Sequence, residues 1–267
     1  MNAVSIKGVS KQFKAGVTAL QGIDLDVEPG EFVSLIGPSG CGKSTLLRII
    51  GDLTKPTAGT VEVNGKPAER ARRDHEYGIV FQDAVLYDWR TVAKNISLPL
   101  ELLHWSRSKR NARIRDMLEL VELSGFENHH PWQLSGGMQQ RVSIARALSF
   151  SPSLLLMDEP FGALDEMTRE RLNAELLGIW QETGSTVVFV THSIPEAVFL
   201  STRVVVMSAR PGRVAGLIEV DLPQPRTSAT REEPHFFELV TQVRERLAAA
   251  GAPLGETQEP ALVEDKA

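Results

Sequence analysis

Cysteine is nearly absent from this chain, since Cys41 is the only one among 267 residues. A single cysteine cannot form an internal disulfide, so its scarcity favours the reducing cytosol over an oxidising compartment. Long apolar runs are absent as well. The longest runs are far shorter than the roughly 18 residues that a membrane-spanning helix needs; they are Leu154 to Met157, Val187 to Val190 and Val204 to Met207. These absences exclude a disulfide scaffold and predict no transmembrane helix.

A large excess of basic charge is also missing. The chain has 34 acidic and 29 basic residues, and its net charge of −5 is not that of a typical nucleic-acid-binding protein. A basic stretch at 107–115 is best explained as a solvated helix face, with nucleic-acid contact as the alternative. The segment 1–11 lacks the apolar core of a signal peptide, so none is expected. We therefore expect a globular protein with no nucleic-acid partner.

Strand and helix patterns alternate along most of the chain, which is 42% hydrophobic and 24% charged. The stretch 91–133 is expected to be mainly helical because its apolar residues recur three or four positions apart. Short β-branched runs separated by helical stretches predict an α/β fold with a parallel sheet and helices on its faces. The expected strands are 4–9, 23–27, 32–36, 60–63, 77–81, 153–158, 186–190 and 203–208. A closing helix is expected at 233–248, and a disordered tail at 249–267.

A phosphate-binding loop is expected between a strand and a helix that begins near Thr45. The sequence there reads Gly37-Pro38-Ser39-Gly40-Cys41-Gly42-Lys43-Ser44, which matches the pattern G-x-x-x-x-G-K-[ST]. In such a loop the backbone N–H groups and the helix dipole bind phosphate. Lys43 is expected to contact the β- and γ-phosphates, and Ser44 to bind Mg²⁺. Cys41 is expected to be a small filler rather than a reactive thiol.

Two adjacent carboxylates follow a later apolar strand, Leu154 to Met157. Asp158 and Glu159 would reach the carboxyl edge of the sheet, where open α/β sheets bind their ligands. Strand alternation points the two side chains in opposite directions, so they can take different roles. Asp158 suits the Mg²⁺ site, and Glu159 suits activation of water.

A second phosphate-binding helix end is indicated by the sequence Leu134-Ser135-Gly136-Gly137-Met138-Gln139-Gln140-Arg141. A serine and two glycines that open a helix offer a hydroxyl and free N–H groups to an anion. One nucleotide site does not need a second such end. The pattern is explained if this helix end of each chain binds the nucleotide that a neighbouring chain holds.

With these motifs in this order, the sequence resembles the ATP-binding subunits of ABC transporters from about residue 4 to about residue 220. The resemblance implies a P-loop NTPase fold of the ABC type, with an N-terminal antiparallel β subdomain. It implies an ATPase domain over 1–232, with a helical subdomain inserted at about 91–150. It also implies ATP and Mg²⁺ as ligands, and hydrolysis of ATP.

The resemblance assigns roles to further residues. Gln82 resembles the Q-loop glutamine near Mg²⁺, Asp165 the D-loop aspartate at a dimer interface, and His192 the switch histidine that holds the γ-phosphate. Phe13 stands where the family usually has an adenine-stacking tyrosine, with ordinary strand packing as the alternative. The expected catalytic residues are Lys43, Gln82, Glu159 and His192, and the expected Mg²⁺ ligands are Ser44, Gln82 and Asp158. The expected nucleotide contacts are Phe13, Gly37, Pro38, Ser39, Gly40, Cys41, Gly42, Lys43, Ser44, Thr45, Gln82, Ser135, Gly136, Gly137, Gln139, Asp165 and His192.

Two classes of function are compatible with this resemblance. One is the energy-coupling subunit of a transporter; the other is a soluble ABC ATPase that acts on nucleic acid or ribosomes. A single ATPase domain, no coiled-coil insertion, no zinc module and a negative net charge favour the transporter. The implied partners are an identical or paralogous subunit, an integral-membrane permease and, indirectly, a solute-binding protein. The implied location is the cytoplasmic face of the inner membrane.

Two segments resemble importer subunits for nitrate, sulfonate, taurine, bicarbonate or pyrimidines. The first is 80–82 followed by 88–92, and the second is 208–214, although Asp88 occupies a position where that group usually has proline. Trp89 is expected to contact the permease, with burial inside the helical subdomain as the alternative.

Overall fold

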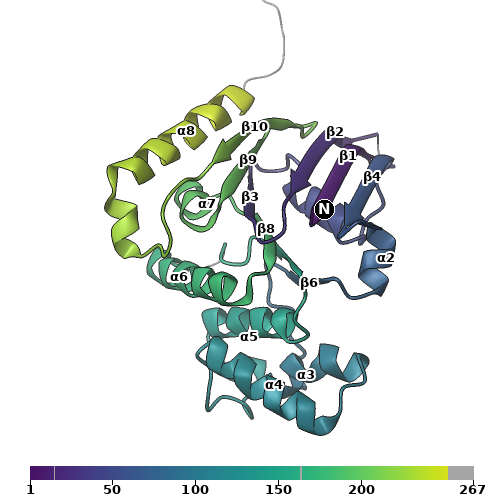
Figure 1. The fold of residues 1–267 in the computed structure, drawn as a ribbon, viewed down its shortest axis with the longest axis vertical. Coiled ribbons are helices and arrows are strands. Elements are labelled where there is room, and N and C mark those ends of the chain that lie inside the picture. Colours follow the sequence, from purple (N-terminus) through teal and green to yellow (C-terminus); the bar gives the residue numbers. More distant parts are fainter. Residues whose placement is uncertain (15, 163, 252–267) are drawn as a thin grey trace, which may run out of the picture.

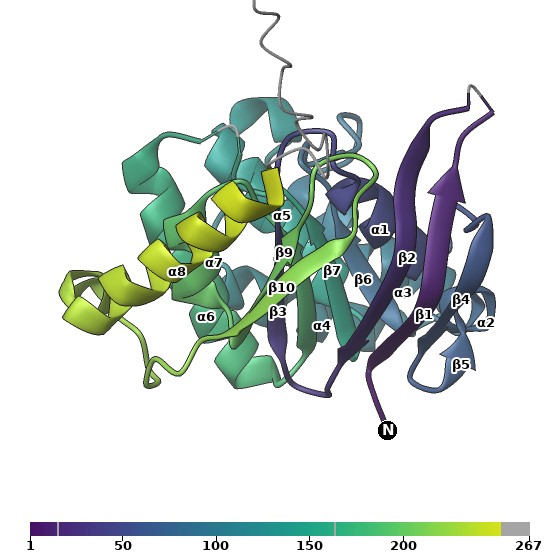
Figure 2. The same ribbon diagram turned by 90° about the horizontal axis from the view of Figure 1, so that it is seen from above.

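Two β-sheets form the frame of the protein in the computed structural model, which describes residues 1–251 except Ala15 and Ala163 (Figure 1). The smaller sheet is antiparallel, in the order β2-β1-β4-β5, and consists of β1 (Val4–Gln12), β2 (Thr18–Val27), β4 (Ala58–Val63) and β5 (Lys66–Pro67). The larger sheet has the order β10-β9-β3-β8-β7-β6 and consists of β3 (Phe32–Ile36), β6 (Tyr77–Val80), β7 (Leu154–Asp158), β8 (Thr186–Val190), β9 (Arg203–Met207) and β10 (Val214–Glu219). It is parallel except for β10, which pairs antiparallel with β9. The expected parallel core and antiparallel β subdomain are confirmed; Figure 2 shows the two sheets next to each other.

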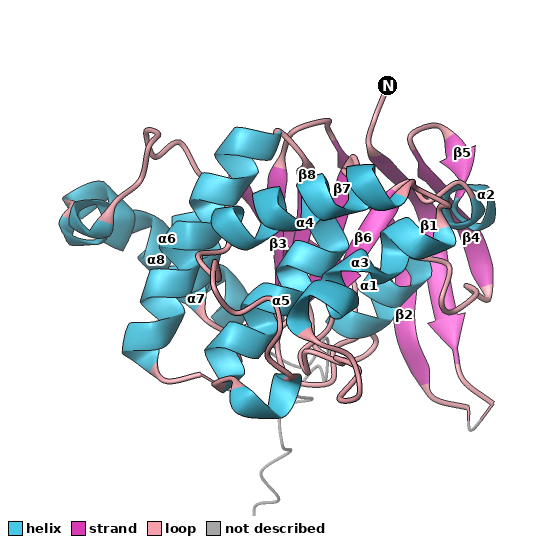
Figure 3. Ribbon diagram, turned by 90° about the horizontal axis from the view of Figure 1, so that it is seen from below, coloured by secondary structure: helices cyan, strands magenta, loops and turns pink. Residues whose placement is uncertain are grey.

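Helices cover the sheets, as the secondary-structure colours of Figure 3 show, and a separate group of helices lies below the sheets in the view of Figure 1. They are α1 (Lys43–Ile50), α2 (Ala68–Arg73), α3 (Val92–Leu102), α4 (Arg107–Leu120), α5 (Gly136–Leu148), α6 (Glu166–Thr183), α7 (Ile194–Leu200) and α8 (Pro234–Gly251), with single turns at Pro131–Gln133 and Ser228–Glu232. Helices α3, α4 and α5 lie together at one end of the molecule, within the segment expected to be an inserted helical subdomain. Among the described residues, no helix is long and apolar enough to cross a bilayer.

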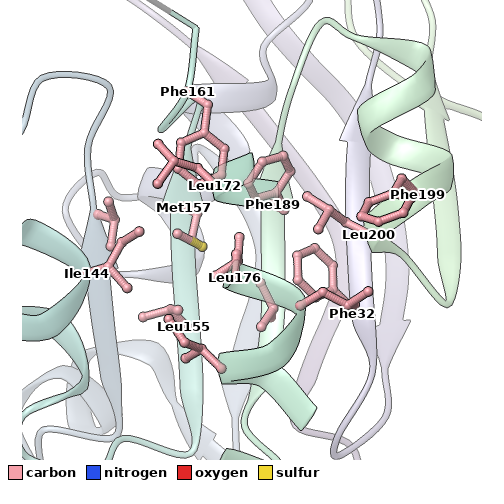
Figure 4. Close-up of a cluster of buried hydrophobic side chains, with 14 of the residues drawn as sticks. Phe32, Ile144, Leu155, Met157, Phe161, Leu172, Leu176, Phe189, Phe199 and Leu200 are labelled. Atoms are coloured by element: carbon pink, nitrogen blue, oxygen red, sulfur yellow. The ribbon is translucent and has the colours of Figure 1, made fainter. Parts of the chain in front are cut away.

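The hydrophobic core lies on both faces of the larger sheet because its inner strands are apolar throughout. All five residues of β3, β7 and β8 are buried. Side chains alternate between the two faces of a strand. Leu155 and Phe189 therefore join the cluster toward α5, α6 and α7 (Figure 4), while Leu154 and Val188 join the cluster toward α1 and the antiparallel sheet. This two-sided burial fixes the sheet in the centre of the protein.

Several elements differ from the sequence-based expectation. Helix α2, helix α7 and strand β10 were not expected. Helix α7 is only seven residues long and buries most of its side chains, so its sequence has no amphipathic period. The expected boundary of the closing helix at 248 is wrong, since α8 continues to Gly251. The remainder of the expected disordered tail, 252–267, lies outside the described residues.

A buried guanidinium joins α7 to the segment after β10. Arg226 is 5% exposed, and its Nη1 donates to the carbonyl oxygens of Val198, Phe199 and Ser201 at 2.8–3.1 Å. Its Nη2 donates to the carbonyl oxygens of Val220 at 3.4 Å and Leu222 at 3.3 Å, in the segment that follows β10. Burial lowers the pKa of Arg226 to about 10, so the group is still charged at neutral pH. The carbonyls at the end of α7 depend on this one side chain.

Replacing Arg226 with Met should therefore destabilise the fold. The variant keeps the apolar stem but leaves buried carbonyls unpaired, each at a cost of about 1–3 kcal/mol. We expect the free energy of unfolding, measured by urea denaturation, to fall by about 3 kcal/mol or more. The exposed Arg244→Met on α8 is the control and should change it by less than about 0.5 kcal/mol. Equal stability of the two variants would contradict the assigned role.

Candidate functional site

Four parallel strands end side by side at one edge of the larger sheet. Strand β3 pairs with β8, β8 with β7, and β7 with β6. Because the carboxyl ends of parallel strands meet at the same edge, the segments that follow them converge there. These segments are the phosphate loop after β3, Glu159 after β7, His192 after β8 and Gln82 after β6. The topology thus gathers residues that are far apart in the sequence.

Side chains from the start of α1 close the phosphate loop. Lys43 is 6% exposed, and its Nζ donates to the carbonyl oxygens of Gly37 at 2.8 Å and Pro38 at 3.3 Å. The hydroxyl of Ser44 donates to Oδ1 of Asp158 at 2.7 Å. The first N–H groups of α1 have no partner within the helix and carry the positive end of its dipole. Loop, lysine and helix end together form an anion-binding site.

Close packing requires glycine at two positions of this loop. A Cβ on Gly37 would lie 2.9 Å from both the sulfur of Cys41 and the carbonyl oxygen of Met207. Gly42 has a φ of 105°, and a Cβ there would lie 2.7 Å from Cδ2 of Leu20. Cys41 is buried, and burial raises the pKa of its thiol. The cysteine is therefore a neutral packing group in the loop.

Asp158 ends β7 as a nearly buried carboxylate. It is 6% exposed, and burial raises the pKa of its carboxyl while the hydrogen bond from Ser44 opposes that rise. Mg²⁺ prefers oxygen ligands and usually takes one or two carboxylates together with substrate phosphates. A hydroxyl and a carboxylate in contact at the start of α1 fit this requirement, so Ser44 and Asp158 could hold Mg²⁺.

Glu159, His192 and Gln82 converge next to this pair. The Nδ1 atom of His192 lies 3.3 Å from Oε2 of Glu159. Gln82 Nε2 and Glu159 Oε2 each lie 3.7 Å from the position that a Cβ on Gly162 would take. Glu159 has a φ of 46°, in a left-handed region that costs a non-glycine residue about 1–2 kcal/mol. Backbone strain of this kind is concentrated at functional sites. In this arrangement the carboxylate of Glu159 can accept a proton from a water molecule, and His192 can hold that carboxylate in place.

A pocket of about 310 Å³ lies over the phosphate loop. Phe13 follows the end of β1 and is 44% exposed in this pocket, so the alternative that it packs within a strand is wrong. The other residues that line the pocket are Val17, Ala19, Ser39, Gly40, Gly42, Lys43, Ser44, Thr45, Glu159 and Arg210. An aromatic face at one side of a phosphate loop suits a nucleotide base, because every base can stack on it.

Sequence reasoning did not assign three of these lining residues to the site: Val17, Ala19 and Arg210. Val17 and Ala19 carry no chemical signal of their own. Arg210 lies in the turn between β9 and β10, and a single charge in a turn has no periodicity to detect. The segment 208–214 around it resembles importer subunits, but this resemblance assigns no role to the arginine.

The second phosphate-binding helix end lies outside this pocket. Ser135 caps α5, and its Oγ accepts a hydrogen bond from the backbone N–H of Met138 at 3.3 Å. The amide of Gln139 donates to the carbonyl oxygens of Pro131 at 3.0 Å and Leu134 at 3.4 Å. The side chain of Gln139 therefore braces the loop that precedes α5.

Asp165, Gly136 and Gly137 belong to the same region. Oδ1 of Asp165 accepts from the backbone N–H of Thr168 at 3.0 Å, so this carboxylate caps α6, and its hydrogen bonds lower its pKa. A Cβ on Gly137 would lie 3.4 Å from Cγ2 of Thr168. Neither Asp165 nor any of 135–139 is among the described residues that line the pocket. Gly37, Pro38, Cys41, Gln82 and His192 do not line it either, but they belong to the phosphate loop or lie beside Glu159. Within one chain, the expected contacts therefore form two groups, one around the phosphate loop and one at the starts of α5 and α6.

A phosphate loop, a buried carboxylate beside its serine, and a second carboxylate beside a histidine define a P-loop nucleotide hydrolase. The family model described as ABC transporter matches residues 20–162, which is more than half of the chain. The chain belongs to the ABC transporter family, as an ATP-binding subunit that hydrolyses ATP.

Individual relatives and a solved structure agree with this assignment. An uncharacterized ABC transporter ATP-binding protein of Methanocaldococcus jannaschii is 50% identical over 81% of this chain and 80% of its own length. The aliphatic sulfonates import ATP-binding protein SsuB of Bacillus cereus is 44% identical over 91% of this chain and 96% of its own. A dimeric ATP-binding cassette in a post-hydrolysis state, bound to ADP and Pi, superposes with a TM-score of 0.72 at 38% identity. It matches 82% of this chain and its own full length.

The geometry predicts that Glu159 is the general base. Replacing it with Gln keeps its shape and removes the proton acceptor, so phosphate release should fall by roughly 10²–10⁴-fold. Binding of ATP should persist, because the phosphate loop is unchanged. The exposed Glu182→Gln on α6 serves as the control and should hydrolyse ATP like the parent. Near-normal turnover by Glu159→Gln would show that another group accepts the proton.

Proposed function

We propose that this protein couples ATP-driven closure of a dimer to uptake of a small solute through a membrane permease. The partner subunit is identical or paralogous, and a solute-binding protein delivers the solute. The protein works at the cytoplasmic face of the inner membrane by docking on the permease. The observation that carries the proposal is the separation of the two phosphate-binding helix ends within one chain.

The chemistry of the site derives from this chain's own residues. Lys43 and the loop N–H groups bind the phosphates, and Phe13 stacks on the adenine. Glu159 accepts a proton from the attacking water, while Gln82 and His192 orient that water and the γ-phosphate. Ser44 and Asp158, with Gln82, would hold Mg²⁺, which would supply positive charge to neutralise the phosphate oxygens. In this proposal each residue acts at the common carboxyl edge of the sheet.

In a dimer, the exposed start of α5 would contact the ATP that is bound to the partner chain. Ser135 and Gly136 are exposed, and neither lines the pocket over the chain's own phosphate loop. A two-fold related partner would bring its bound ATP against Ser135 and Gly137, and this arrangement closes on itself. These contacts exist only in the closed dimer, so ATP favours closure and hydrolysis reopens it.

An apolar groove next to Gln82 supplies the surface for the permease. It has a volume of about 330 Å³ between β6, α3 and α5, and its walls include Tyr77, Phe81, Tyr87, Leu102, Leu103 and Phe150. Trp89, with 75% of its surface exposed, packs its ring on Tyr87 at a centroid distance of 4.9 Å. The alternative that Trp89 is a core residue is therefore wrong. A groove of this kind suits the apolar face of a short helix.

The solute is proposed to be a small oxyanion of the nitrate, sulfonate or taurine type. The similarity to the aliphatic sulfonates import protein, which extends over 96% of that relative, supports this class. The solute itself would contact the permease and the solute-binding protein. Uptake of an aliphatic sulfonate by cells with and without this gene tests the proposal directly, with nitrate as the comparison solute.

The two phosphate-binding elements should respond differently to substitution. Lys43→Ala should weaken binding of ATP to the isolated monomer, because that site lies within the chain. Ser135→Arg should leave monomer binding nearly intact but abolish ATP-dependent dimers and hydrolysis. Equilibrium binding and size-exclusion chromatography with ATP distinguish the variants. Equal loss of monomer affinity in both would contradict a site shared between chains.

Trp89→Ala should weaken assembly with the permease without affecting the isolated subunit. Loss of an exposed aromatic anchor typically costs about 2 kcal/mol, which is roughly 30-fold in affinity. The melting temperature and ATP affinity should not change, since the side chain is mostly exposed. Phe237→Ala is the matched control, because Phe237 is 56% exposed on α8, at the other end of the molecule from α3. Equal retention of both variants by permease-containing membranes would overturn the docking role.

A further inference from the structure

The turn between β9 and β10, residues 208–213, is packed against the phosphate loop. The backbone N–H of Gly212 donates to the carbonyl of Ala19 at 2.9 Å, and that of Gln21 donates to the carbonyl of Gly212 at 3.0 Å. A Cβ on Gly212 would lie only 2.0 Å from the carbonyl oxygen of Cys41. Only glycine allows this approach, so the turn and the loop have a fixed relative position.

A serine side chain fixes the shape of this turn from inside. The Oγ of Ser208, whose side chain is buried, accepts from the backbone N–H of Arg213 at 3.0 Å. The same oxygen lies within donating distance of the carbonyls of Ala209 at 3.1 Å and Pro211 at 3.2 Å. The turn is therefore an ordered platform, and the residue at its tip has a defined direction.

Arg210 projects from this platform over the phosphate loop. Its Nη2 and Nε atoms donate to the carbonyl oxygen of Gly40 at 3.1 and 3.3 Å. Arg210 lines the same pocket as Phe13, Lys43 and Glu159. Among the described residues, no carboxylate lies within ion-pair distance of Arg210. Its Nη1 group has no hydrogen-bond partner there either, so positive charge and N–H donors face the pocket.

We propose that Arg210 binds the phosphate chain of the nucleotide held by the phosphate loop of its own chain. A guanidinium forms charge-assisted, often bidentate hydrogen bonds with phosphate oxygens. Lys43 already donates to two loop carbonyls, and Arg210 supplies a second cation to the same pocket. This contact is additional to those that the motifs predict, and it does not depend on the permease or on the solute.

Binding of ATP and ADP to the isolated subunit, measured by calorimetry, tests this contact with three variants. Arg210→Met removes the charge and keeps the stem, and it should weaken binding of both nucleotides by about tenfold or more. Arg210→Lys keeps a point charge and should retain most of the affinity. The control is Arg213→Met in the same turn, because Arg213 bonds to Gln21 at 2.7 Å and does not line the pocket. It should bind as the parent does.

The salt dependence of binding separates a phosphate contact from a purely structural brace. If Arg210 contacts phosphate, Arg210→Met should also reduce the loss of ATP affinity with rising salt. Parent-like affinity of Arg210→Met would overturn the proposal. It would also be overturned if Arg210→Met and Arg210→Lys weakened binding equally, with an equal fall in the melting temperature of the nucleotide-free protein. That result would mean that Arg210 only supports Gly40.

Discussion

The parallel pairing of β3, β8, β7 and β6 is the constraint on which the site depends. Strands β3, β8 and β7 are buried on both faces, and β6, at the edge of the sheet, is fully buried on one face. A shift in the order or register of these strands would therefore expose apolar surface. The carboxyl ends of the strands consequently meet at one edge. The hydrogen bond from Ser44 to Asp158 connects the phosphate loop to β7 across that edge. Both the phosphate loop and the carboxylates that face it are positioned by the core rather than by their own sequences.

Neighbouring backbone segments also hold the phosphate loop in place, because they pack closely against it. The antiparallel sheet contributes Ala19 and Leu20, and the turn after β9 contributes Gly212, all in contact with the loop. Glycine at three positions (37, 42 and 212) permits this packing. The loop is thus held in place by segments from both sheets. Preorganisation of this kind lowers the ordering cost of binding.

Helix α5 connects the exposed helix end at Ser135 to the apolar groove that is proposed to bind the permease. It begins at the exposed phosphate-binding end beside Ser135. Farther along, Gln140 donates to the carbonyl of Phe81 at 3.1 Å, and Arg146 donates to that of Val85 at 2.8 Å. Both acceptors lie beside Gln82 and the apolar groove. Val85 has a φ of 45°, a strained conformation for a β-branched residue. A movement of α5 would therefore displace the groove and the helix end together.

The sequence by itself determined the α/β class, the phosphate loop, the two carboxylates and the family, because these depend on local spacing and on strand alternation. It also indicated the helix end at Ser135, whose serine and glycines are a local capping signal. Only the tertiary structure decided that Arg210 lines the pocket and that Asp165 caps α6 within its own chain. The exposure of Trp89 and the presence of helix α7 were likewise seen only in the tertiary structure. Each of these depends on contacts between distant segments or on burial from all sides, which no local periodicity records.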